Sequence, residues 1–486
     1  MLREALAHTR LSLEELWYRY FALGGTAGLV EVDAFLEGLL PLADAQRDLL
    51  ALAVNERIDD LSGRVRAPYT FHLRTEVPPT GSLPAVLHLV TGMHSAPPER
   101  LAEVTRKAGE VLGVELDVLL VDYEQETLRP IVDDPAGVRP QAVDTTFAGQ
   151  SYRSVRALAH GSELWVPLLN GMERLGVLHV RTGEMAADDR VLQERCLWLG
   201  KLIGHLVVAS SAYGDALDVI RRTRRRRPSA ELLWNLLPPL TAGTDRVLMA
   251  AMMHPVYGLG GDAFDYDIAE STARVAVFDA AGHDLGASLT VASALSAYRS
   301  ARHSGGGLLP QLEAVDEAVM DRSRSGEDFV TGVLAELDLH TGRLRYVLAG
   351  HPPPLLLRQG RLVKRLDHPR RPFLGIGEYG GSEIGTESLE ADDWLLFYTD
   401  GITEARDGDG AFFGEDRLVD FLRREILAGE PAPETVRRLS RAIMRHQEGA
   451  LQDDATVLLL QWTPGGRRRR GPGPAEQPSH MTGAER

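Results

Sequence analysis

Cysteine is almost absent from this chain of 486 residues. The only cysteine is Cys196, which excludes a disulfide framework and a cluster of thiolate metal ligands. No run of about 18 apolar residues exists that could span a bilayer. The N-terminal segment mixes charged with apolar residues and lacks a secretory hydrophobic region. These absences predict a cytoplasmic protein with no membrane partner.

The chain also has fewer Lys and Arg residues (53) than Asp and Glu residues (69), which gives a formal net charge of −16. General nucleic-acid binding needs many phosphate-neutralising Lys and Arg residues, so nucleic acid is not an expected partner. One basic run, Arg221, Arg222 and Arg224–Arg227, could suggest a DNA-binding regulator. It contains no aromatic residues, no helix-turn-helix pattern accompanies it, and it falls in an expected linker helix. We therefore expect it to form a solvated face.

The length predicts more than one domain, and a composition of 44% apolar and 25% charged residues is typical of soluble globular proteins. The fold class we expect is a multidomain α/β chain. The expected parts are an N-terminal helical segment (1–80), an α/β domain (85–212), a linker helix (213–244), a larger C-terminal α/β domain (245–462) and a Gly-, Pro- and Arg-rich tail (463–486) that should be disordered.

The N-terminal segment shows apolar residues near helical spacing. They are Leu13, Leu16, Phe21, Val32, Phe35, Leu39, Leu49, Leu50, Leu52 and Ile58. No chemistry-bearing motif accompanies them. We interpret this segment as a small helical bundle for dimerisation or docking, so a homodimer is one expected assembly.

The segment from 85 to 212 alternates helical and strand patterns. A helix over Leu101–Leu112 leads into a strand over Asp117–Tyr123. A hairpin over 164–180 turns at Asn170-Gly171, a dipeptide that supplies the positive φ angles of a tight turn. A long amphipathic helix over 188–211 follows.

This order, with the segments VLLVDYEQETLRPI and WVPLLNGMERLGVLHV, resembles a GAF domain. The resemblance implies a small-molecule ligand or a role in dimerisation, and the ligand itself cannot be identified. His160 and His179 are candidate ligand contacts, although a lone histidine more often has a structural role.

Aspartates recur at the ends of expected strands in the C-terminal region. They lie in the segments GLGGDAFDYDI, RVAVFDAAGHD, WLLFYTDGITEAR and LQDDATVLLL, and are Asp262, Asp279, Asp400, Asp453 and Asp454. A carboxylate at the end of a buried strand is costly unless it is solvated, paired or bound to a cation. One such residue alone is more often a turn or cap residue, but the set favours a metal site. Oxygen ligands suit Mg²⁺ or Mn²⁺ rather than Zn²⁺.

The segments GGDAFDY, FDAAGHD, AGHPPPLLL, FYTDGITEARDGDGAFFGEDRL and DDATVLLL together resemble the PPM metal-dependent phosphatases, in their bacterial SpoIIE-like stress-response and sporulation branch. The likeness covers most of residues 245–462. It implies an α-β-β-α sandwich with a binuclear metal centre in a cleft at one end. The whole arrangement resembles multidomain sensor phosphatases.

The resemblance also implies roles for individual residues. Asp279 would bridge two divalent cations, Mn²⁺ or Mg²⁺. Asp262 and the backbone carbonyl of Ala280 would help to hold one ion, and Asp400 and Asp453 would hold the other. Asp279 and Asp262 would thus be the central catalytic groups. The supporting positions would be Glu404, Asp454 and Thr456.

A general acid for the leaving oxygen is not evident. His283 lies four residues beyond Asp279, and His351 lies in the turn AGHPPP. For each, a structural and a functional role remain open, and protonation by water is the further alternative.

The function these patterns favour is a metal-dependent protein serine/threonine phosphatase that uses an activated water. The resemblance implies a phosphorylated regulatory protein as substrate, such as an anti-sigma-factor antagonist. The alternative is a catalytically silent scaffold that binds partners through its helical and GAF-like regions. Packing of the linker helix, about Ser229–Leu240, against the phosphatase would couple the two halves.

The remaining patterns predict the body of the sandwich. Strands are expected over Phe329–Leu337 and Leu344–Ala349, joined by a turn. The predicted core residues of the neighbouring helices are Leu289, Ala292, Leu295, Leu312, Val315 and Val319.

Overall fold

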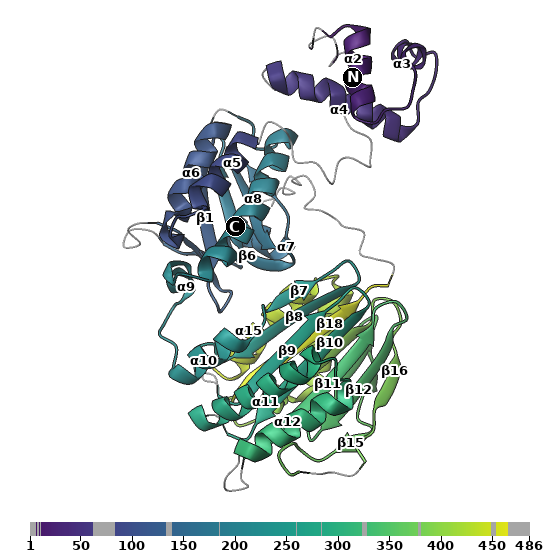
Figure 1. Cartoon of the computed structure of the whole chain (residues 1–486). Coiled ribbons are helices and arrows are strands. Elements are labelled where there is room, and N and C mark those ends of the chain that lie inside the picture. The colour runs from purple at the N-terminus through teal and green to yellow at the C-terminus, as the bar shows by residue number, and fades with distance from the viewer. Residues whose placement is uncertain are drawn as a thin grey trace, which may run out of the picture.

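The computed structural model describes residues 6, 9, 11–61, 83–132, 139–183, 185–258, 260–282, 284–322, 328–377, 381–448 and 453–464. Figure 1 shows three bodies along the chain: a group of helices, an α/β domain and a two-sheet sandwich. No helix within these described ranges is long and apolar enough to cross a membrane. The tail from residue 465 onward lies outside the described residues.

The N-terminal body consists of helices α2 (Leu13–Ala22), α3 (Leu29–Leu36) and α4 (Asp44–Leu61). Ser12 begins α2 as a capping box, since its hydroxyl accepts from the Glu15 amide and the Glu15 carboxylate accepts from the Ser12 amide. Leu16, Tyr20 and Val32 are buried between the helices. The predicted helical segment is confirmed as far as residue 61, and residues 62–82 lie outside the described ranges.

The α/β domain is built on one antiparallel sheet of order β3-β2-β1-β6-β5-β4. Its strands are β1 (Glu115–Val121), β2 (Thr127–Pro130), β3 (Gln141–Ala142), β4 (Leu158–His160), β5 (Glu163–Asn170) and β6 (Glu173–Arg181). Its helices are α5 (Leu83–Met93), α6 (Leu101–Leu112), α7 (Phe147–Ser154) and α8 (Arg190–Ser211), with the short helix η2 (Pro98–Arg100) before α6. Helices α5, α6 and α8 cover one face of the sheet and α7 part of the other. The predicted Asn170-Gly171 hairpin is confirmed, with Gly171 at a φ of 60°.

The segment between the two α/β bodies holds two short helices rather than one linker helix. They are α9 (Ala216–Arg221) and α10 (Pro228–Leu236). The predicted solvated face is wrong for Arg226, which is only 8% exposed. Its guanidinium stacks over Tyr123 at 4.2 Å and over Trp234 at 4.9 Å. Tyr123 lies about 100 residues away along the sequence, so no local pattern could reveal this burial.

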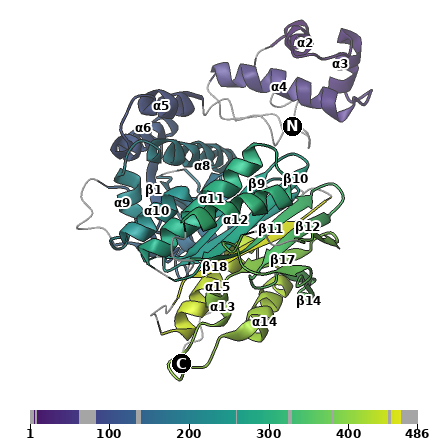
Figure 2. The same ribbon diagram turned by 60° about the horizontal axis from the view of Figure 1, so that its bottom comes forward.

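The C-terminal body is a sandwich of two sheets (Figures 1 and 2). The first sheet has the order β15-β12-β11-β10-β9, with β16 also paired to β12, and the second has the order β14-β13-β17-β18-β8-β7. The strands of the first sheet are β9 (Asp262–Ile268), β10 (Thr272–Ala280), β11 (Val330–Asp338), β12 (Arg343–Ala349), β15 (Arg370–Arg371) and β16 (Gly385–Ser388). Those of the second are β7 (Thr241–Gly243), β8 (Val247–His254), β13 (Leu355–Arg358), β14 (Arg361–Arg365), β17 (Trp394–Tyr398) and β18 (Ala455–Trp462).

Helices cover both outer faces of the sandwich. Helices α11 (Leu285–His303) and α12 (Leu308–Arg322) pack on the first sheet, and α14 (Gly414–Leu427) and α15 (Ala432–His446) on the second. This is an α-β-β-α layering. Leu295, Leu312, Val315 and Val319 are buried as predicted, but Leu289 is 39% exposed because the buried stripe of α11 runs through neighbouring positions.

Candidate active site

Two aspartates lie side by side at one edge of the first sheet. Asp262, the first residue of β9, is the cross-strand partner of Asp279 near the end of β10. On the other side of Asp279, its partner on β11 is Thr331. Directly opposed residues project from the same face of a sheet. The neighbouring Phe278 packs edge-on against Tyr298 of α11, so this row faces the second sheet.

The second sheet brings further carboxylates to the same edge. Strand β17 ends at Tyr398, and Asp400 begins the short helix α13 (Asp400–Thr403). The antiparallel partner β18 begins directly after Asp453 and Asp454. Thr399 joins the two sheets, because its hydroxyl donates to Asp262 Oδ2 at 2.8 Å.

Asp454 anchors the loop that leads into β9. Its Oδ2 accepts hydrogen bonds from the amides of Gly260 at 2.9 Å and Gly261 at 2.5 Å. A Cβ at Gly261 would lie 2.5 Å from the Ala280 carbonyl oxygen, so the close approach of these two segments requires glycine. This geometry matches the supporting role that the family resemblance implies for Asp454.

The aspartates at this edge lie at different depths, and their charges repel one another. Asp400 and Asp453 are exposed, Asp279 is half-buried and Asp454 is buried. Asp262 is 1% exposed. Burial, and then the charges of Asp279 and Asp454, hold its pKa well above the usual value. Burial raises the pKa of Asp279 to about 8, and Asp400, Asp453 and Asp454 act in the same direction. Partial desolvation of the Asp400 carboxylate raises its pKa, and the charges of Glu404 and Asp453 act in the same direction.

The donor chemistry of this edge fits a hard divalent cation. The aspartates of this edge and the hydroxyls of Thr331 and Thr399 offer oxygen atoms, which are the ligands of Mg²⁺ and Mn²⁺. A cation would also relieve the repulsion that raises the pKa values of Asp262, Asp279 and Asp400. Within the described part of the chain, however, no three acidic, His or Cys side chains converge into a preformed ligand set. The structure thus brings the predicted metal residues to one edge without drawing them together.

Comparison with known proteins adds a family to this geometry. The family described as stage II sporulation protein E (SpoIIE) matches residues 269–463. The chain is 23% identical over 216 residues to phosphoserine phosphatase RsbU of Bacillus subtilis, which covers 44% of this chain and 62% of that protein. It is 26% identical over 166 residues to phosphoserine phosphatase RsbP of the same organism, covering 33% of this chain and 40% of that protein.

The C-terminal half contains a SpoIIE-type phosphatase domain. Solved structures similar to the chain include the RsbU and RsbW domains of Rv1364c from Mycobacterium tuberculosis, at 26% identity and a TM-score of 0.39, covering 45% of this chain and 62% of that one. The SiaA-PP2C domain of Pseudomonas aeruginosa is 23% identical with a TM-score of 0.41, covering 52% of this chain and 98% of that one. The chain spans less than two thirds of the curated relatives RsbU and RsbP.

Two histidines of this domain, His283 and His351, were the candidates for a general acid. His283 lies outside the described residues. His351 is 4% exposed and so does not line the rim of the site. Burial lowers its pKa to about 3, while the Tyr398 backbone acts in the opposite direction. A ring that is neutral and enclosed at neutral pH is a poor general acid.

The predicted ligand contacts of the α/β domain belong to a stack of rings. His160 stacks on Phe147 at 4.8 Å, Phe147 on Trp165 at 5.1 Å, and Trp165 on His179 at 5.5 Å. The stack explains both histidines structurally, and their role as ligand contacts stays a prediction.

The α/β domain meets the phosphatase domain through buried charges that the sequence did not reveal. Glu434 on α15 is fully buried and binds Arg174 of β6 at 3.2 Å and Arg437 at 2.8 Å. Arg437 also pairs with Asp144 of the α/β domain at 2.7 Å. Burial alone would raise the pKa of Glu434, but hydrogen bonds from Arg437 and the charge of Arg174 outweigh it and lower that pKa.

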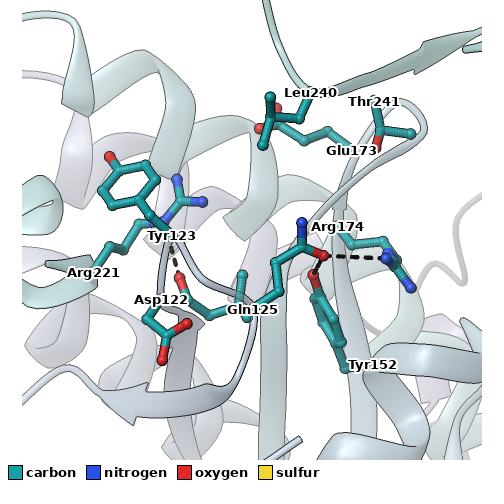
Figure 3. Close-up of a pocket in the computed structure, with 10 residues that line it drawn as sticks. Asp122, Tyr123, Gln125, Tyr152, Glu173, Arg174, Arg221, Leu240 and Thr241 are labelled. Carbon is teal, nitrogen blue, oxygen red and sulfur yellow. Dashed lines mark hydrogen bonds between the residues drawn. The ribbon is translucent and has the colours of Figure 1, made fainter. Parts of the chain in front are cut away.

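A small pocket opens beside this contact (Figure 3). Its lining combines Tyr152, Glu173 and Arg174 of the α/β domain with Leu240 and Thr241 at the start of β7. The Gln125 side-chain oxygen accepts from Tyr152 at 2.9 Å and from Arg174 at 3.3 Å (Figure 3). The polar side chains of Gln125, Tyr152 and Arg174, all from the α/β domain, thus bind one another.

Proposed function

We propose that this chain is a metal-dependent protein phosphatase that hydrolyses phosphoserine or phosphothreonine. The observation that carries the proposal is the pair Asp262 and Asp279 at the joined edge of two sheets, within a domain of SpoIIE type. Among the residues that the structure describes, no arginine or lysine forms an ion pair with either carboxylate. Carboxylates kept at such a cost mark functional sites more often than structural ones.

Asp279, Asp262 and the Ala280 carbonyl would hold one divalent cation, and Asp279, Asp400 and Asp453 a second. Bound cations would supply a water of lowered pKa and neutralise charge on the phosphoryl oxygens. The chain's own contribution is to place these ligands. Thr399 holds Asp262 from the second sheet, and Asp454 holds the loop that precedes it.

The test is hydrolysis of a small aryl phosphate and of a phosphothreonine peptide, in Mn²⁺ or in EDTA, by wild type and by Asp279→Asn. We expect turnover that needs Mn²⁺ and is lost in the variant. Absence of turnover with Mn²⁺ and with Mg²⁺ would favour the silent scaffold instead.

We propose a phosphorylated regulatory protein as the substrate, such as an anti-sigma-factor antagonist. Its support is the likeness to RsbU and RsbP, both named phosphoserine phosphatases. The same proposal has four further parts, all predicted from the sequence. The domains span residues 85–212 and 245–462, and the first of them is a GAF domain that binds a small molecule. The chain forms dimers, and it is located in the cytoplasm.

We also propose that the α/β domain regulates the phosphatase domain. Glu124, in the turn after β1, accepts from the hydroxyl of Tyr257 at 2.9 Å. Tyr257 lies in the loop from β8 to β9, which ends at Asp262 and is anchored by Asp454. In addition, α10 packs on α11, where Arg299 donates to the Leu236 carbonyl at 2.7 Å. These contacts support the coupling predicted for the linker.

Regulation through this loop has a direct test in the full chain. Glu124→Ala removes the contact with Tyr257 and should change Mn²⁺-dependent turnover, whereas Glu110→Ala on the exposed side of α6 should not. Equal turnover in both variants and wild type would argue against this route.

A further inference from the structure

His351 lies directly beside the row of residues that holds the aspartates. It follows β12 and Gly350, whose positive φ of 63° turns the chain there. Gly350 forms a bridge with Gly332, the residue after Thr331 on β11. The turn thus returns the chain to the edge of the first sheet that carries Asp262 and Asp279.

A hydrogen bond connects His351 to this row. Its Nδ1 lies 2.8 Å from the hydroxyl oxygen of Thr331. Thr331 is the cross-strand partner of Asp279, and Asp279 is the partner of Asp262. Because directly opposed side chains lie about 5 Å apart on the same face, the order across the edge is Asp262, Asp279, Thr331, His351.

The other ring nitrogen faces buried surroundings. No hydrogen bond of ordinary geometry reaches Nε2 from the described residues, but the ring lies close enough to the Tyr398 backbone for a polar contact that acts to raise its pKa. Tyr398 lies two residues before Asp400 on the second sheet. The ring therefore lies between the strand ends that carry Asp279 and Asp400.

In this position His351 can hold a neighbouring side chain in place, but it does not neutralise the charge of the aspartates. At neutral pH the ring is neutral and adds no positive charge to offset the carboxylates. It is also too enclosed to contact a protein substrate. What it can do is hold the Thr331 side chain, and with it the strand end next to Asp279. Outer groups that orient ligands in this way contribute about 10-fold to about 100-fold to metal affinity.

We propose that His351 is a positioning residue of the metal site, which holds Thr331 so that Asp279 faces the carboxylates of the second sheet. This inference rests on the proposed function, because it assumes that Asp279 binds a divalent cation. It assigns a role to the histidine of the AGHPPP turn other than that of a general acid.

The test measures Mn²⁺ binding to the full chain by calorimetry, with turnover as a second readout. Thr331→Val removes only the hydroxyl that contacts His351, and His351→Asn removes the ring. We expect each to weaken Mn²⁺ binding about 10-fold or more while kcat recovers at saturating Mn²⁺. The double variant should be little worse than the more affected single variant, because both act through one contact. Thr105→Val, the same change at a more deeply buried threonine on α6 of the α/β domain, is the control and should bind Mn²⁺ as wild type does.

Wild-type Mn²⁺ affinity in a folded Thr331→Val chain would overturn the inference, as would additive losses in the double variant. If His351→Asn does not fold, Thr331→Val decides alone. Failure of wild type itself to bind Mn²⁺ is a different result, because it refutes the proposed metal-dependent function and the inference with it.

Discussion

Strand β9 carries two buried carboxylates on opposite faces, and the protein treats them differently. Asp265 is 2% exposed and faces α11, where Arg299 and Arg302 bind it at 2.9 Å. Asp262 is 1% exposed and faces the second sheet, where it accepts a hydrogen bond from Thr399. Among the described residues, no arginine or lysine forms an ion pair with Asp262.

The same contrast, between a carboxylate paired with arginines and one that is not, holds between Glu434 at the contact of the two domains and Asp279 at the joined edge of the two sheets. Glu434 is surrounded by Arg174, Arg437 and Arg438, and its pKa is lowered despite complete burial. Asp279 has other aspartates as neighbours, and its pKa is raised to about 8 by burial and by their charges. The chain surrounds Glu434 with its own arginines, whereas no arginine or lysine of the described residues forms an ion pair with Asp262 or Asp279. That difference is what the proposed binding of an external cation beside Asp262 and Asp279 would explain.

The largest effect we expect is the loss of turnover when Asp279, a carboxylate without an arginine or lysine ion pair among the described residues, is replaced. Asp279→Asn should lower Mn²⁺-dependent turnover at least about 1,000-fold, or about 4 kcal/mol of barrier, because it removes the carboxylate expected to serve both cations. The measurement is the steady-state rate on an aryl phosphate. Asp265→Asn, on the other face of β9, should retain turnover per folded molecule. Wild-type turnover in Asp279→Asn would contradict the assignment.

Replacing Glu434, the carboxylate that is paired with arginines, should instead lower the stability of the fold. Glu434→Gln leaves the charges of Arg174 and Arg437, whose side chains are 4% and 2% exposed, without their main counter-charge. We expect the free energy of unfolding to fall by about 3 kcal/mol, measured by urea denaturation without metal. Asp420→Asn, an exposed change on α14, is the control and should have little effect. Equal stability of Glu434→Gln and wild type would show that the buried pairs contribute nothing net.

Adding Mn²⁺ should distinguish Asp262 from Asp265, the two buried carboxylates of β9. At a free Mn²⁺ concentration of about 100 times Kd, wild type should gain about 2.7 kcal/mol of stability. Asp262→Asn should lose most of this gain, because it removes an expected ligand. Asp265→Asn should start from a lower stability yet keep the gain. The readout is the unfolding midpoint with Mn²⁺ and with EDTA, and an equal gain in all three chains would remove Asp262 from the ligand set.

These contrasts were only partly accessible from the sequence. Strand patterns ending in aspartate predicted which carboxylates lie at the joined edge of the two sheets, because those patterns are local. The hydroxyls of Thr331 and Thr399 were missed, since their partners come from other strands. The Arg174–Glu434 pair joins residues 260 positions apart, and no local signal marks it. Burial of Arg226 was mispredicted for the same reason.

The smallest effect we expect concerns pH at the domain contact. The pKa of Glu434 is lowered in the folded chain from a usual value of 4.5, so its stabilising contribution is complete above that value and is lost as the pH falls through the folded pKa. The stability difference between wild type and Glu434→Gln should therefore be constant near neutral pH and shrink below about pH 4.5. The effect is small because burial opposes the arginines. The measurement is the urea midpoint of both chains in EDTA over a series of acidic buffers. A difference that stays unchanged in acid would mean that packing, and not the charge of Glu434, holds the two domains together.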